Sequence, residues 1–149
     1  MNEYSFEQCV VGTKASFDVV ITDAYHKMFG GATGDINPMH TEKSYAVSRG
    51  YRGEIVYGMC TASFYSTLVG VYLPGKYALL LGIDVQFPKP VYIGDRLRVS
   101  GTIIDRNDFF RRITIKAEMR NQNGEKVSRA KIFVGLMDNG FEAGNDTVV

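Results

Sequence analysis

The second half of the chain alternates apolar and polar residues with a period of two. The segments 96–105, 111–121 and 126–137 all follow this alternation, which is typical of strands that bury one face. The segment 77–87 is apolar almost throughout and also predicts a strand. Between the last two strands, the sequence NQNGE at 121–125 is a hairpin turn signal. Four consecutive strands with short connections predict an antiparallel sheet.

The first half of the chain combines one strand with short helices. Residues 16–22 are rich in β-branched side chains and predict a strand. Thr22 or Asp23 is a suitable N-cap for a short helix over 24–34, which ends in glycines. Residues 41–50 have the same pattern and predict a second short helix.

The segment 55–73 is apolar nearly all round and dense in small residues, which predicts a buried helix. It is the large apolar element available to cover the buried face of the sheet. The expected fold is therefore α+β, a single hotdog domain over residues 1–149 in which a curved antiparallel sheet wraps around a long central helix. Its core is expected at about 15–137, followed by a loose tail at 138–149.

Composition limits the possible partners. The chain has 149 residues, of which 45% are hydrophobic and 22% are charged, as in one globular domain. The formal net charge is +1, which gives no argument for binding nucleic acid or an anionic membrane. The N-terminal stretch lacks the apolar core of a signal peptide, and no apolar run is long enough to span a bilayer. The expected location is the cytoplasm.

The cysteines and histidines are too few to suggest a metal or disulfide framework. Cys9 and Cys60 are the two cysteines, and Cys60 lies in an apolar run where a buried small hydrophobe is expected. His26 and His40 are the two histidines, without a Cys pair or a carboxylate cluster beside them, so no metal site is predicted. His26 lies in the first short helix and is expected to be exposed to solvent.

The sequence GATGDINPMH at 31–40 is the strongest candidate for chemistry. It places Asp35 five residues before His40, with Pro38 and several glycines imposing an irregular backbone. A carboxylate and an imidazole are a suitable pair for moving protons at neutral pH. The alternative is an ordinary polar turn in which Asp35 caps the backbone. The position of the loop, directly before the buried helix, favours the acid/base pair.

Two further positions have a structural and a functional interpretation. Gly58, at the start of the buried helix, can bring its backbone amide close to a ligand oxygen, or can simply allow close helix packing. Lys89 can contact a ligand phosphate, but an exposed loop lysine is the favoured interpretation.

From about residue 20 to 137 the chain resembles the MaoC-like dehydratases, the family of (R)-specific 2-enoyl-CoA hydratases. TGDINPMH matches the D-x-N-P-x-H motif of the family, IVYGM and the small-residue helix match a second stretch, and FPKPVYIGD matches a third. The resemblance assigns the catalytic roles to Asp35 and His40, with Asn37 as the Asn of the motif. It places the Gly58 amide at the thioester carbonyl and Ser63 near the catalytic pair.

The resemblance implies reversible addition of water to a trans-2-enoyl thioester, carried by coenzyme A or an acyl carrier protein, to give an (R)-3-hydroxyacyl thioester. No cofactor or metal is implied, and the expected assembly is a homodimer. The chain departs from the family at Tyr57, where histidine is common, so this residue bears on the substrate. The alternatives are a hotdog acyl-thioesterase and a non-catalytic acyl-thioester binding module.

Overall fold

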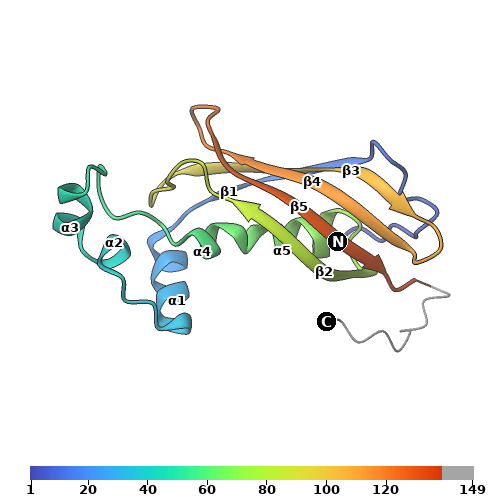
Figure 1. The fold of residues 1–149 in the computed structure, drawn as a ribbon, viewed down its shortest axis with the longest axis horizontal. Coiled ribbons are helices and arrows are strands. Elements are labelled where there is room, and N and C mark those ends of the chain that lie inside the picture. Colours follow the sequence, from blue (N-terminus) through green and yellow to red (C-terminus); the bar gives the residue numbers. More distant parts are fainter. Residues whose placement is uncertain (139–149) are drawn as a thin grey trace.

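The computed structural model describes residues 1–138 (Figure 1). The strands of the sheet are β1 (Lys14–Val20), β2 (Ala78–Gln86), β3 (Arg96–Asn107), β4 (Arg112–Arg120) and β5 (Lys126–Leu136). The helices are α1 (Asp23–Thr33), α2 (Pro38–Thr41), α3 (Lys43–Ser48), α4 (Gly58–Ala62), α5 (Phe64–Thr67) and the π-helical turn η1 (Leu68–Tyr72).

All five strands form one antiparallel sheet in the order β1-β3-β4-β5-β2. The strands β3, β4 and β5 pair consecutively through short turns, as the alternating pattern predicts. Their apolar positions are buried and face the concave side, which gives the core its main layer: Leu97, Val99, Ile103, Ile113, Ile115, Ala117 and Met119.

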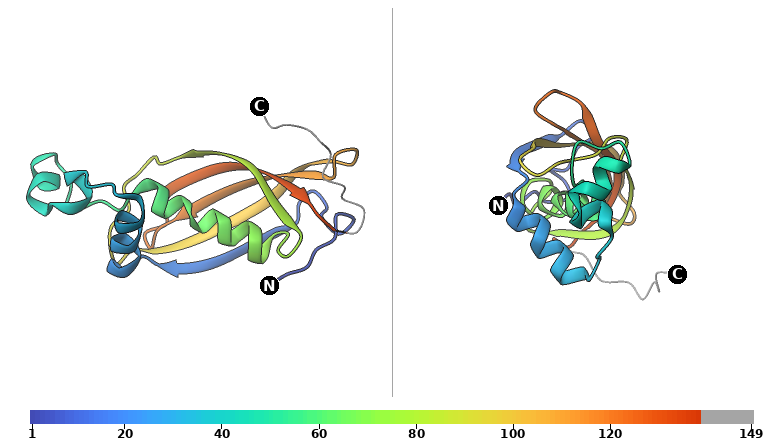
Figure 2. Two further views of the ribbon diagram at one scale, coloured as in Figure 1. Left: turned by 90° about the horizontal axis from the view of Figure 1, so that it is seen from below. Right: turned by 90° about the vertical axis from the view of Figure 1, so that its left-hand side faces the viewer.

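The helical segment formed by α4, α5 and η1 lies along the concave face of the sheet (Figures 1 and 2). Leu68 is fully buried, and Tyr65 donates its hydroxyl to Ser128 in β5 at 3.0 Å. A Cβ atom at Gly101 of β3 would lie 2.8 Å from the Leu68 side chain and 3.0 Å from Ile115. The helix therefore approaches the sheet as closely as it does because position 101 has no side chain.

This architecture confirms the predicted α+β hotdog fold, with two differences in detail. The central helix begins at Gly58, three residues later than the predicted start. The single helix predicted over 41–50 is instead divided between α2 and α3. The division arises because Asn37 caps an earlier turn that begins with Pro38, and because Glu42 then adopts an extended backbone.

The segment from α1 to α3 projects beyond one end of the sheet (Figure 1). It links the edge strand β1 to the start of the central helix. The sequence GATGDINPMH therefore lies at the end of the sheet where the central helix begins. No helix within residues 1–138 is long and apolar enough to cross a membrane.

The end of the last strand is held more firmly than the sequence suggests. Asp138, the first residue of the predicted loose tail, is 8% exposed. Its carboxylate accepts a hydrogen bond from the Phe6 amide at 2.7 Å and pairs with Arg111 at 2.6 Å. The rest of that predicted tail, residues 139–149, lies outside the described residues.

The close approach at Gly101 is testable by overpacking. Gly101→Val is expected to lower the free energy of unfolding by about 1–3 kcal/mol, because the new side chain overlaps Leu68 and Ile115. Thr102→Val, on the opposite face of the same strand, is the matched control and is expected to have little effect. Urea unfolding of both variants measures the difference, and equal midpoints would contradict the packing argument.

Candidate active site

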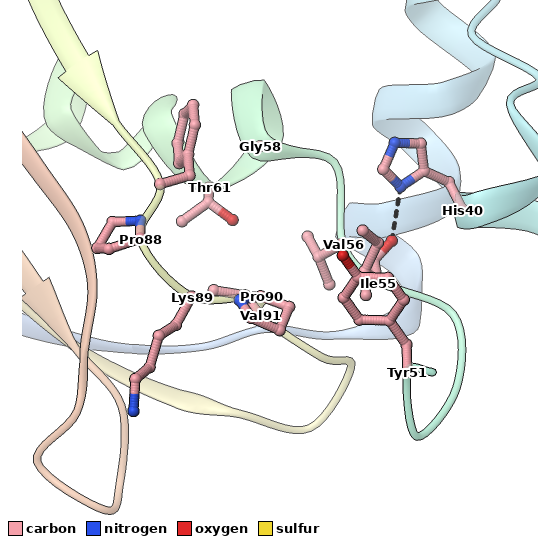
Figure 3. Close-up of a pocket in the computed structure, with 11 residues that line it drawn as sticks. His40, Tyr51, Ile55, Val56, Gly58, Thr61, Pro88, Lys89, Pro90 and Val91 are labelled. Atoms are coloured by element: carbon pink, nitrogen blue, oxygen red, sulfur yellow. Dashed lines mark hydrogen bonds between the residues drawn. The ribbon is translucent and has the colours of Figure 1, made fainter. Parts of the chain in front are cut away.

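Two pockets adjoin at His40, between the projecting segment and the central helix. The first has a volume of about 250 Å³, and isoleucine, valine, phenylalanine and proline side chains make up much of its lining (Figure 3). Its lining includes His40, Gly58, Thr61, Phe87, Pro90 and Val91. The second has a volume of about 360 Å³ and is lined by His26, Gly30, Asp35, His40, Glu54 and Tyr57, among others. His40 therefore contacts both the apolar pocket and the pocket that contains the carboxylate.

His40 is held in one orientation by a backbone carbonyl. Its Nδ1 lies 2.7 Å from the carbonyl oxygen of Ile55 (Figure 3). A carbonyl oxygen only accepts hydrogen bonds, so Nδ1 must carry the proton of the neutral imidazole. The lone pair is then on Nε2, which can accept a proton from a molecule in the site.

Asp35 lies in a loop that is folded by its own side chains. The helix α1 ends at Gly34, whose φ of 73° is a left-handed conformation suited to glycine. Asp35 Oδ1 then accepts from the Asn37 amide at 3.0 Å, and Asn37 Oδ1 accepts from the Met39 amide at 2.9 Å. These two bonds turn the chain into α2, and Asp35 is exposed and lines the second pocket.

Tyr57 contacts both Asp35 and His40, the two ends of the loop at 35–40. Its hydroxyl donates to the backbone carbonyl of Asp35 at 2.8 Å, and its ring lies 4.1 Å from the His40 ring between centroids. Burial, followed by the negative charge of Asp35, raises the pKa of Tyr57, so the phenol keeps its proton and remains a donor. Tyrosine is accommodated because Gly30 leaves room, since a Cβ atom there would lie 2.5 Å from the Tyr57 oxygen.

The prediction that His26 is exposed to solvent is wrong. The residue is 5% exposed, and its Nε2 lies 2.7 Å from the backbone carbonyl of His40. Its ring also lies 4.7 Å from the ring of Tyr57. The polar pattern of α1 gave no sign of this burial, because the side chain is covered only when α1 packs against the loop around His40 and Tyr57.

Gly58 lies in the wall of the first pocket at the start of α4. Its amide is the first in the helix and has no acceptor within the helix. A Cβ atom at this position would lie 3.2 Å from the Phe87 ring, so glycine also permits the close approach of the segment after β2. The backbone amide is thus available to an oxygen atom bound in the pocket.

Two other candidate residues lie apart from the pair. Ser63 is exposed, lines neither pocket, and donates its hydroxyl to the Cys60 carbonyl at 2.6 Å. Lys89 lies at the rim of the first pocket and forms an ion pair with Glu125 at 2.5 Å. Residues 1–138 contain no group of three or more His, Cys, Asp or Glu side chains that could hold a metal ion.

The fold and the site together define a hotdog domain in which the loop carrying Asp35 and His40 lies near the N-terminal end of the central helix. The chain belongs to the MaoC like domain family, whose model matches residues 7–125. The resemblance identified from the sequence motifs is therefore confirmed.

Characterised relatives and a solved structure agree with this membership. The chain is 34% identical over 93 residues to an (R)-specific enoyl-CoA hydratase of Aeromonas caviae, covering 62% of this chain and 69% of the relative. It is 33% identical over 98 residues to the enzyme of the same name from Rhodospirillum rubrum, covering 66% and 68%. The structure of an (R)-hydratase from A. caviae involved in PHA biosynthesis superposes with a TM-score of 0.81 at 28% identity, covering 85% and 96%.

The contact between Gly30 and Tyr57 can be tested with a double-mutant cycle. Gly30→Ala is expected to destabilise the protein by about 1–3 kcal/mol because its methyl group overlaps the Tyr57 hydroxyl. Tyr57→Phe removes that oxygen and leaves the Asp35 carbonyl unpaired, at a cost of about 1 kcal/mol. The alanine should cost less in the Tyr57→Phe background. Additive changes in the urea midpoint would show that the two residues do not interact.

The buried thiols are expected to be unreactive near neutral pH. Burial raises the pKa of Cys9 to about 11 and also raises the pKa of Cys60. Both thiols therefore remain protonated, and a disulfide reagent should label them much more slowly in the native protein than in urea. Because the native state holds the Cys9 proton more tightly than the unfolded chain, this group also lowers stability as pH rises toward about 11. Rapid native labelling would contradict the burial.

Proposed function

We propose that this protein catalyses the reversible hydration of trans-2-enoyl thioesters to (R)-3-hydroxyacyl thioesters. The observation that carries the proposal is the position of His40, which lies between a pocket containing the Asp35 carboxylate and an apolar pocket containing the Gly58 amide. The names of the relatives, which are hydratases of enoyl-CoA, support the same reaction.

In the proposed mechanism, His40 Nε2 accepts a proton from a water molecule that Asp35 also orients. The water oxygen bonds to C3, and the π electrons of the C2–C3 bond move onto the thioester carbonyl oxygen. The Gly58 amide donates a hydrogen bond to the resulting enolate oxygen. The imidazolium of His40, stabilised by Asp35, then returns the proton to C2 on the same face. Addition of one water is complete, and His40 is again neutral.

Neither pocket is large enough for a whole acyl-CoA molecule, so the apolar pocket is suited to the acyl end of the thioester. We propose that a second copy of the chain completes the binding surface for the carrier, coenzyme A or an acyl carrier protein. The strand β2 is an open edge of the sheet, and Leu79 and Leu80 on it are 37% and 46% exposed. Pairing of the β2 strands of two copies would cover both the open edge and the exposed leucines.

The decisive assay is loss of the conjugated enoyl absorbance of crotonyl-CoA with a parallel assay for free thiol. The wild type is expected to remove the absorbance without releasing thiol. Asp35→Asn and His40→Ala are each expected to lower kcat by about 100-fold or more, as loss of an acid or base does. Asp105→Asn, at an exposed position of β3 that lines neither pocket, is the control and should keep full activity.

Other outcomes select the alternatives. Release of free thiol would identify an acyl-thioesterase and would overturn the hydratase proposal. Binding of acyl thioesters without turnover of short, long or carrier-protein-bound substrates would identify a binding module. Sedimentation of the wild type and of a Leu80→Lys variant tests the dimer, since a charge at the paired edge should yield monomers.

A further inference from the structure

The apolar pocket contains one buried polar side chain that the proposed mechanism does not use. Thr61 is 1% exposed and lines the pocket together with His40 and Gly58. Its hydroxyl has no hydrogen-bond partner anywhere in residues 1–138. Figure 3 shows the hydroxyl pointing into the pocket. Buried hydroxyls nearly always have a partner, so an unpaired one in a pocket wall indicates a group that binds there.

The local backbone does not supply the missing partner. A helical threonine commonly donates its hydroxyl to the carbonyl four residues earlier. Here the Tyr57 carbonyl accepts the Thr61 amide at 3.1 Å, and the hydroxyl makes no hydrogen bond to it. Valine has nearly the same shape and no polar atom to bury, so the hydroxyl does not stabilise the fold through the described chain.

The position of Thr61 on the helix indicates which atom of a substrate it can reach. Gly58 and Thr61 are three residues apart, so they lie on the same face of the helix and are separated by about 4.5 Å along its axis. The Gly58 amide and the Thr61 hydroxyl are therefore two donors in one wall of one pocket. A single acceptor oxygen bound between them can receive both hydrogen bonds.

We propose that Thr61 contacts the substrate and that its hydroxyl donates a second hydrogen bond to the thioester carbonyl oxygen, beside the Gly58 amide. This inference rests on the proposed function. As water adds to C3, the displaced π electrons make this oxygen more negative, so both hydrogen bonds strengthen in the transition state. A group of this kind affects kcat more than KM.

The test compares Thr61→Val, which removes only the hydroxyl, with Thr61→Ser, which keeps it. With crotonyl-CoA, Thr61→Val is expected to lower kcat by about 10- to 100-fold with little change in KM. Thr61→Ser should stay close to the wild type. Thr67→Val, on the same helix but outside the pocket lining, is the matched control. The melting temperature of Thr61→Val should equal or exceed that of the wild type, which separates a lost contact from a damaged fold.

A second measurement does not require turnover. Acetoacetyl-CoA forms an enolate whose absorbance reports hydrogen bonding to its oxygens, so the bound enolate fraction should fall in Thr61→Val and persist in Thr61→Ser. Unchanged kcat and unchanged enolate absorbance in Thr61→Val would overturn the inference and leave the hydratase proposal intact. A wild type that is inert with enoyl thioesters but shows the Thr61-dependent enolate would overturn the proposed function alone. Failure to bind any acyl-CoA would overturn both.

Discussion

The structure depends on the burial of one helical segment in the concave face of a curved sheet. The packing of Leu68 against Gly101 sets the distance between the two layers, because any side chain at position 101 would meet Leu68 and Ile115. The inward apolar positions of β3, β4 and β5 form the core together with this segment. The helical segment that packs in this way begins at Gly58, in the wall of the first pocket.

The loop at 35–40, which carries Asp35 and His40, is positioned by hydrogen bonds to backbone carbonyls. His40 donates to the Ile55 carbonyl, Tyr57 donates to the Asp35 carbonyl, and His26 donates to the His40 carbonyl. Each bond joins residues that are 14 to 22 positions apart along the chain. These bonds leave His40 Nε2 without a partner in residues 1–138, while one Asp35 carboxylate oxygen accepts the Asn37 amide and so also holds the loop. Tyrosine in place of histidine at position 57 thus serves as a tether, which a neighbouring glycine makes possible.

The first pocket is lined by both apolar and polar residues. Valine and proline side chains and the Phe87 ring form the apolar part of the first pocket, while Gly58 and Thr61 of the helix and His40 contribute polar groups. In such a setting each hydrogen bond to a developing charge is stronger than it is in water. The strand β2 is an open edge of the sheet with two exposed leucines, Leu79 and Leu80.

The sequence by itself determined the strands, the central helix, the hotdog fold and the motif that carries Asp35 and His40. These features follow from period-two alternation, an apolar helical run and residue spacing, all of which are local properties of the chain. Only the tertiary structure decided that His26 is buried, that Tyr57 spans from His40 to Asp35, and that Ser63 lies outside both pockets. The tertiary structure alone also shows that the Thr61 hydroxyl has no hydrogen-bond partner in residues 1–138. Each of these depends on which faces meet when α1 and the loop pack against the helix, and spacing along the chain does not encode that contact.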